Sequence, residues 1–98
     1  MDGALRFDWD DYIAHLARRC VLPEEVEQSV SGPIVDLEYR VTAEGEERWT
    51  AMGRTYAGRL LVVVWTVRDS GAYRAITAYP ATRRLESVYY RVIHGTET

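Results

Sequence analysis

An apolar run, a turn and a second run rich in β-forming residues constrain the fold of this chain more than any other feature. The first run, Leu60–Val67, has strand length and is rich in β-branched residues, Asp69-Ser70-Gly71 is a turn cluster, and residues 73–79 form the second run. This order predicts a β-hairpin. Because Leu60–Val67 has almost no polar side, both of its faces should be at least partly covered, and it should lie in the middle of a sheet.

The residues before the hairpin predict two helices and two further strands. Apolar residues at steps of three and four predict helices over residues 10–20 and 21–30, the second buried along Leu22, Val26 and Val30 and stopped by Gly32-Pro33. Alternation with a period of two predicts a strand over Ile34–Val41, with one dry and one wet face, and a turn then leads to a strand over Glu47–Arg54.

A last helix should follow the hairpin. Pro80 ends the strand and Thr82 can cap the helix, whose buried stripe would be Leu85, Val88, Tyr89 and Val92. The expected architecture is a single α+β domain over residues 1–98, with a core at about 5–92 and a tail at 93–98. It has two N-terminal helices, about four antiparallel strands and a C-terminal helix, with the helices against one face of the sheet.

Composition limits the setting. The 98 residues suffice for one domain, and the single cysteine, Cys20, excludes an internal disulfide framework, so the default setting is reducing and cytoplasmic. No apolar run approaches the roughly 20 residues of a membrane-spanning helix, and the N-terminus is acidic where a signal peptide would be basic. We expect a soluble protein without a membrane partner.

Charge is segregated along the chain. Residues 1–47 hold twelve of the fifteen acidic residues and four arginines, whereas residues 48–98 hold eight arginines and three acids. All twelve basic residues are arginine, whose guanidinium suits phosphate recognition, although a compositional bias that replaces lysine by arginine explains this equally well. The bias does not explain the segregation, and the basic half is a candidate nucleic-acid face.

Familiar catalytic signatures are missing from the sequence. It has no GxSxG, P-loop, GxGxxG, CxxC or HExxH motif, and its two histidines, His15 and His94, stand far apart. We therefore expect neither a metal site nor a cofactor.

What the sequence does offer is a set of arginines and hydroxyls around the second hairpin strand. Strict alternation puts Thr77 and Tyr79 on one face of that strand and Arg74, Ile76 and Ala78 on the other. If Ile76 and Ala78 face the helices, an open face with tyrosines and a rim of arginines can stack bases and hold phosphates. The candidate phosphate-binding residues are Arg48, Arg54, Arg68, Arg84 and Thr77. The alternative is that these are ordinary edge residues and cross-strand packing.

Three segments together resemble the BrnT-like toxin family. The family opens with F-x-W-D, R/K-H-G-V and an acidic helix, and the segment FDWDDYIAHLARRCVLPEEVEQSV is similar to this opening. The family's core, E-R-W/Y-x-x-x-G followed by L-x-V-V-x-T-x-R, is similar to GEERWTAMGRTYAGRLLVVVWTVRD. Its closing R-I-I-S/T-A-R is similar to the start of YRAITAYPATRRLESVYY. The resemblance covers roughly residues 5–91. It implies a RelE-like fold and a ribonuclease toxin of a type II toxin–antitoxin pair, silenced by an antitoxin encoded beside it.

The sequence departs from the family pattern at three places. The family's R/K-H-G-V segment is Arg18-Arg19-Cys20-Val21 here, which lacks the histidine and the glycine. The Lys or Asn of the family's first helix is absent, and Ile13 is the nearest position. Tyr79 replaces the arginine of S/T-A-R. The arginines that match positions usually basic in the family are Arg48, Arg54, Arg68, Arg74, Arg83 and Arg84.

Cleaving RNA without a metal needs a base for the 2′-hydroxyl proton, cations for the phosphorane and an acid for the leaving oxygen. Arg74 with Arg83 or Arg84 can supply the cations, Tyr79 can donate the proton, and His15 has a convenient unperturbed pKa for the base. The first hypothesis is thus a metal-independent endoribonuclease toxin that acts on RNA. Its antitoxin would bind it, and an oligomer of the two chains is one possible form of this complex. The second is a non-catalytic RelE-like module that binds a protein or nucleic acid through the same sheet face.

Overall fold

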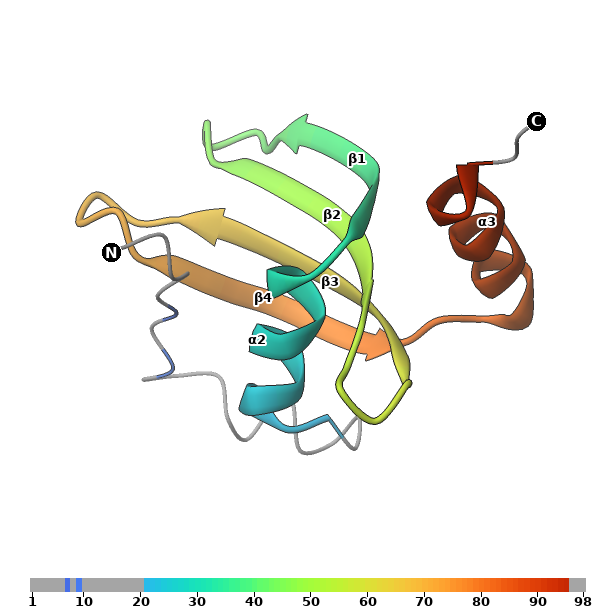
Figure 1. Ribbon diagram of the computed structural model, residues 1–98. Coiled ribbons are helices and arrows are strands. Elements are labelled where there is room, and N and C mark those ends of the chain that lie inside the picture. The colour runs from blue at the N-terminus through green and yellow to red at the C-terminus, as the bar shows by residue number, and fades with distance from the viewer. Residues whose placement is uncertain (1–6, 8, 10–20, 96–98) are drawn as a thin grey trace.

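The computed structural model describes Phe7, Trp9 and residues 21–95 of the chain. In chain order these residues form α2 (Pro23–Ser31), β1 (Ile34–Val41), β2 (Glu47–Arg54), β3 (Leu60–Val67), β4 (Tyr73–Pro80) and α3 (Arg83–Ile93), as Figure 1 shows. The predicted α+β class and the four antiparallel strands are confirmed. The helix expected over residues 10–20 falls outside the described residues.

The four strands form one meander in the order β1-β2-β3-β4, each antiparallel to the next. β3 lies between β2 and β4, and Leu60, Leu61, Val62 and Val63 in its first half are all buried. This confirms the central place predicted for the apolar run, because successive side chains of a strand point to opposite faces and both faces here are covered.

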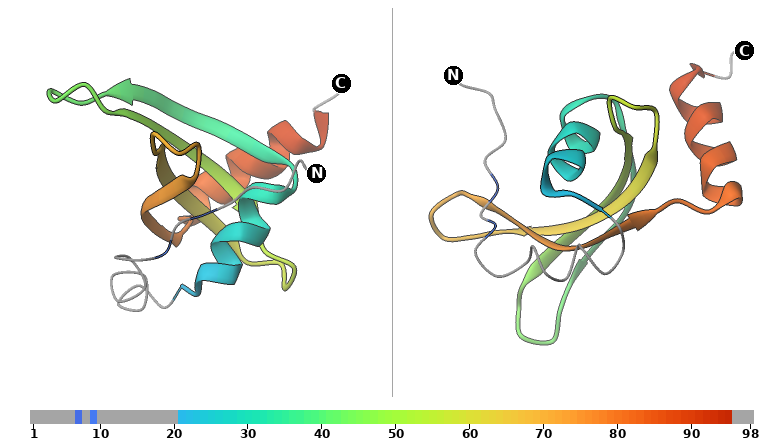
Figure 2. Two further views of the ribbon diagram at one scale, coloured as in Figure 1. Left: turned by 90° about the vertical axis from the view of Figure 1, so that its left-hand side faces the viewer. Right: turned by 90° about the horizontal axis from the view of Figure 1, so that it is seen from below.

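The helices cover opposite faces of the sheet, so the prediction that they share one face is wrong (Figure 2). On the face we call the α2 face, Leu61 and Val63 join a buried cluster with Val26 and Val30 of α2. On the other, the α3 face, the alternate residue Val62 joins a second cluster with Tyr89 of α3. A strand that is apolar on both sides offers both faces for packing, and each helix takes one of them.

α2 lies very close to the sheet. A Cβ built on Gly53 of β2 would stand 1.8 Å from the carbonyl oxygen of Ser29, so glycine is needed for this approach. The helix starts with Pro23 in its first turn, and the Glu25 carboxylate accepts a hydrogen bond from the Leu22 amide. Leu22 is 58% exposed, so its predicted burial is wrong; Val21 is buried instead.

α3 begins as the sequence predicts. The Thr82 hydroxyl accepts a hydrogen bond from the Leu85 amide at 3.2 Å, which caps the helix. Tyr89 is buried and its hydroxyl donates to the carbonyl of Pro33 at 2.9 Å. Val92 is exposed, contrary to the predicted stripe, and Ile93 packs against the cluster in its place.

Two strands carry a register shift. In β4 the pair Val64–Thr77 is followed by Trp65–Ala75, so Ile76 is an extra residue. In β1 the pairs shift between Asp36 and Glu38. Each shift is a β-bulge that turns the side chains beyond it to the opposite face from the one that strict alternation predicts. Among the described residues no helix is long and apolar enough to cross a membrane.

Candidate nucleic-acid interface

The bulge in β4 brings together side chains that strict alternation separates. Arg74 pairs with Thr66, Thr77 with Val64 and Tyr79 with Val62, and these three β3 residues alternate along one face. Arg74, Thr77 and Tyr79 therefore all belong to the α3 face. The prediction that Arg74 lies opposite Thr77 and Tyr79 is wrong, because Ile76 interrupts the alternation.

The bulge in β1 adds an arginine that the sequence analysis missed. Strict alternation starting from Val35 makes residue 40 part of the opposite face, but beyond the bulge Arg40 pairs with Arg48. A row of arginines, Arg40, Arg48 and Arg74, thus crosses the α3 face near the ends of β1, β2 and β4. The bulge, the one signal that would have revealed Arg40, has no signature in the sequence.

Glu46 lies at this row. Its carboxylate is 2.8 Å from Arg48 Nε and 3.8 Å from Arg74 Nη1, and the three side chains are each about one-third exposed. The backbone of Glu46 is fixed by the β1–β2 turn, where the Thr42 amide donates to the Glu46 carbonyl at 2.9 Å and the Glu46 amide donates to Thr42 Oγ1 at 3.1 Å. A carboxylate is therefore held between two guanidinium groups.

A groove of about 870 Å³ extends from Glu46 toward the β3–β4 turn. Its lining includes Arg68, Arg74, Asp69 and Ser70 from the second hairpin. The groove therefore brings two of the predicted basic residues, Arg68 and Arg74, to one end of the sheet.

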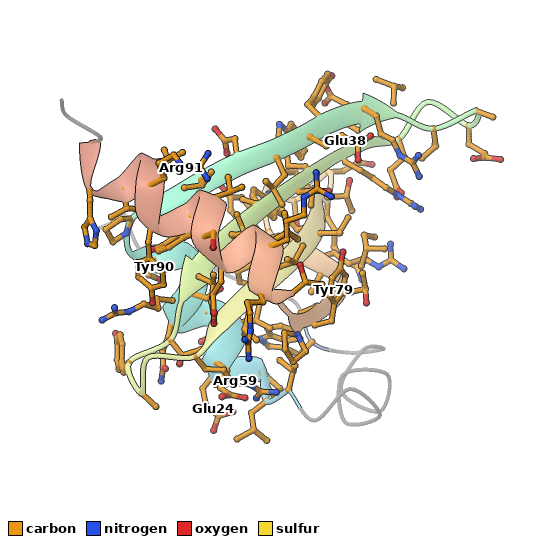
Figure 3. All side chains as sticks on the ribbon, turned by 90° about the vertical axis from the view of Figure 1, so that its right-hand side faces the viewer. Glu24, Glu38, Arg59, Tyr79, Tyr90 and Arg91 are labelled. Atoms are coloured by element: carbon orange, nitrogen blue, oxygen red, sulfur yellow. The ribbon has the colours of Figure 1, made fainter. Side chains whose placement is uncertain are left out.

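Tyr79 of β4 lies further along the same face, beside the start of α3 (Figure 3). Its side chain is partly buried against the cluster around Val62 and Tyr89, and Figure 3 shows it beside the first turns of α3. Arg83 and Arg84 occupy the first turn of that helix and are exposed. The predicted residues thus follow one direction along the α3 face, from the arginine row through Thr77 to Tyr79 and α3.

Residues 8–84 match the family model described as the ribonuclease toxin BrnT of a type II toxin–antitoxin system. The chain belongs to this family of BrnT ribonuclease toxins. The match spans α2, all four strands and the start of α3, and so includes every arginine of the row together with Tyr79, Arg83 and Arg84. The searches of curated proteins and of solved structures gave no significant match.

Family membership gives the chain a substrate class and a partner. A type II ribonuclease toxin acts on RNA and has an antitoxin as its partner, so this BrnT toxin needs a surface for phosphates. Its arginine row offers one, since guanidinium groups bind phosphate oxygens in pairs. The predicted base, His15, lies outside the described residues.

Arg54 does not join the arginine row of this BrnT toxin. It stands at the other end of β2, where it is exposed and its Nη1 lies 3.5 Å from the Tyr90 hydroxyl. A pocket of about 490 Å³ lies there between the ends of α2 and α3, and His94 also lines it. The Tyr90 and His94 rings are 5.8 Å apart, so the second histidine of the sequence is remote from Glu46.

Four aromatic side chains of the toxin lie together on the α2 face. Tyr39, Trp49, Trp65 and Tyr73 form a continuous series of ring contacts across the four strands. The hydrogen bond from the Tyr39 hydroxyl to the Glu47 carboxylate, at 2.6 Å, is the main reason why the pKa of Tyr39 is raised. The Tyr73 ring is stacked on Trp65 and so lies on the opposite face of the sheet from Tyr79.

Proposed function

We propose that this BrnT toxin binds and cleaves RNA on the α3 face, between the arginine row and the first turn of α3, without a metal ion. One observation carries the proposal. The β4 bulge puts Arg74, Thr77 and Tyr79 on the same face as Arg40 and Arg48, so that cations and a proton donor lie along one path. An extended RNA strand fits such a path, because its phosphates need cations and its leaving oxygen needs an acid.

In this proposal the arginines stabilise the transition state. Arg74 and Arg48 bind the scissile phosphate and offset the charge that develops on the phosphorane, while Arg68 holds a neighbouring phosphate. Arg83 and Arg84, at the exposed start of α3, contact the strand beyond Tyr79. Thr77 lies between these two groups and can donate a hydrogen bond to a ribose or phosphate oxygen. Arg54 can contact only a distant part of a longer RNA.

Tyr79 protonates the 5′ oxygen as it leaves. Its phenol is placed on the α3 face by the pairing of Tyr79 with Val62, and packing against the α3 cluster limits its rotamers. The family's arginine at this position could act only as a cation, so the tyrosine changes the chemistry available at the end of β4. His15, the base that the sequence predicts, stays a candidate for the proton of the 2′-hydroxyl.

The proposed partner is a cognate antitoxin encoded beside the toxin gene, and the two chains assemble into an oligomer in the cytoplasm. The meander of four antiparallel strands with a helix on each face supports a RelE-like fold. An antitoxin that covers the α3 face would block the arginine row and silence the toxin.

Purified toxin incubated with single-stranded RNA in the presence of a chelator tests the proposal. We expect endonucleolytic products with 5′-hydroxyl ends, at a rate that Arg74→Ala lowers at least about 100-fold. Arg91→Ala is the matched control, because Arg91 is an exposed arginine on α3 away from the row, and it should cleave at the wild-type rate.

The opposite result would point to a non-catalytic module. Folded wild-type protein that binds RNA but leaves it intact, with and without added divalent ions, contradicts cleavage on this face. Cleavage that stops in the chelator would contradict only the absence of a metal.

A further inference from the structure

The turn that holds Glu46 gives the site a fixed carboxylate. Thr42 bonds both the amide and the carbonyl of Glu46, and the side chain then reaches Arg48 at 2.8 Å and Arg74 at 3.8 Å. Both arginines belong to the row proposed to bind phosphate. A phosphate bound by Arg48 and Arg74 would therefore lie beside the Glu46 carboxylate.

We propose that Glu46 is the general base of the cleavage reaction, a role that rests on the proposed function of the α3 face. Glu46 removes the proton from the ribose 2′-hydroxyl of a nucleotide whose 3′ phosphate is bound by Arg48 and Arg74. The reaction needs such a base near the cations, and a carboxylate that is ionised at neutral pH can accept the proton.

Other carboxylates of the described residues fit the role less well. Glu38 belongs to the α3 face but is exposed on β1 (Figure 3), and no ion pair joins it to an arginine of the described residues. Glu25 is paired with Arg59 at 3.0 Å, at the other end of the sheet. Glu46 alone among the described acids contacts two arginines of the row.

Charged groups of both signs face Glu46. Arg48 and Arg74 contact it, Arg68 lines the same groove, and Glu47 and Asp69 line the groove from the two hairpins. Of these groups, the three arginines supply the positive charge that a bound phosphate needs.

The step balances with the groups present. The 2′-hydroxyl proton moves to a Glu46 oxygen, the 2′ oxygen forms a bond to phosphorus, and the bond from phosphorus to the 5′ oxygen breaks. The 5′ oxygen takes the Tyr79 proton, which leaves a 2′,3′-cyclic phosphate and a 5′-hydroxyl. Glu46 then returns its proton to water and Tyr79 regains one from water.

The order of the groups along the strands suits an in-line displacement. Glu46 lies at the hairpin end, the pair Arg48 and Arg74 comes next, and Tyr79 lies beyond them. The β3 partners of Arg74 and Tyr79 are Thr66 and Val62, four residues or about 13 Å apart along the strand, and long side chains can span this interval. Base and acid thus stand on opposite sides of the phosphate-binding arginines.

Single-turnover cleavage and RNA binding of Glu46→Gln test the inference. We expect the cleavage rate to fall at least about 100-fold, while affinity for RNA is equal to or higher than that of the wild type because a negative charge leaves the phosphate site. In the wild type the cleavage rate should rise with pH as a carboxylate loses its proton, and this rising limb of the pH–rate profile should be absent in Glu46→Gln. Glu46→Asp should keep measurable cleavage and should show the rising limb. Glu38→Gln, which removes a charge from the same face, should leave rate and profile unchanged.

Two results would overturn the inference. Glu46→Gln that cleaves at the wild-type rate, or that is slow but keeps the wild-type acid limb, shows that Glu46 is only a counter-ion of the arginines. A histidine-type limb that is lost in His15→Ala and kept in Glu46→Gln assigns the base to His15. If the wild type does not cleave, or Arg74→Ala cleaves normally, the proposed function itself fails, whatever Glu46→Gln does.

Discussion

Glu46 and Arg74 meet across the sheet at 3.8 Å although they belong to different hairpins. Such a pair must open, or its geometry must change, when a phosphate binds Arg74. Both side chains are about one-third exposed, and partly exposed ion pairs of this kind contribute little free energy because water screens them. The pair therefore orients Arg74 without holding it strongly enough to exclude RNA.

Arg40→Ala should weaken RNA binding in a salt-dependent way. Arg40 faces Arg48 on the edge strand and is exposed, so it can bind a phosphate without first breaking an ion pair among the described residues. The logarithm of the RNA association constant falls as the logarithm of the salt concentration rises. Removing one phosphate contact should make this slope less steep by about 0.7 for single-stranded RNA. Fluorescence anisotropy with a labelled oligonucleotide at several salt concentrations measures this slope.

Arg91→Ala serves as the control for Arg40→Ala. It removes the same charge from the exposed surface of α3, so any effect of net charge alone is common to both variants. An equal change of slope in the two variants would show that the arginine row is not the binding site.

The strands were predictable because their signals are local. The apolar run Leu60–Val67 and the turn cluster after it define β3 and the start of β4, and the observed bounds of the first three strands are those predicted. Thr82 was identified as a cap from its position after Pro80, and its hydrogen bond to the Leu85 amide confirms this.

The composition of the candidate site was not predictable, because it depends on two bulges. Ile76 is an ordinary strand residue in sequence, and only the pairing of β4 with β3 shows that it is the extra one. A single inserted residue reverses the face of every side chain beyond it, which decides whether Arg74 joins Thr77 and whether Arg40 joins Arg48. Likewise, the side on which α3 packs is set by tertiary contacts of Tyr89 and not by the pattern of the helix.

Thr82→Ala should destabilise the start of α3 and loosen Arg83 and Arg84. The variant loses the cap hydrogen bond at 3.2 Å to the Leu85 amide, which should lower the free energy of unfolding by about 1 kcal/mol. Chemical denaturation measures this change. Ser87→Ala, an exposed substitution within the same helix, should change the stability by less than about 0.5 kcal/mol. Equal stability of Thr82→Ala and the wild type would mean that the cap is not formed in solution.

Tyr89→Phe should change how stability depends on alkaline pH. Burial raises the pKa of Tyr89, an effect that the positive charge of Arg54 partly offsets and Tyr90 reinforces. A phenol with a raised pKa in the folded state contributes stability that is present below about pH 10, its unfolded pKa, and is lost as the pH rises through the folded value. The wild type should therefore lose stability above about pH 10 more steeply than the variant.

At neutral pH the same substitution removes the hydrogen bond from Tyr89 to the Pro33 carbonyl at 2.9 Å, which should cost about 1 kcal/mol. Urea denaturation of both proteins between neutral and alkaline pH gives the two effects separately. The exposed substitution Tyr56→Phe should leave the neutral stability unchanged. A difference between wild type and Tyr89→Phe that stays constant across the whole pH range would contradict the buried phenol.

Gly53→Ala tests the closest approach in the fold. A methyl group on Gly53 would stand 1.8 Å from the Ser29 carbonyl oxygen and 2.6 Å from its carbonyl carbon, so α2 must move away from β2. Overpacking of this kind costs about 3 kcal/mol or more, and here it acts on a backbone that cannot rotate aside. Since α2 also supplies Val26 and Val30 to the buried cluster, its displacement should expose part of that cluster. Thermal unfolding followed by circular dichroism should show a lower midpoint, with increased binding of a hydrophobic dye.

Gly32→Ala is the matched control, because a Cβ there has no atom within 4 Å and the backbone φ is −99°. If Gly53→Ala were as stable as Gly32→Ala, α2 would have to lie further from β2 than the structure places it.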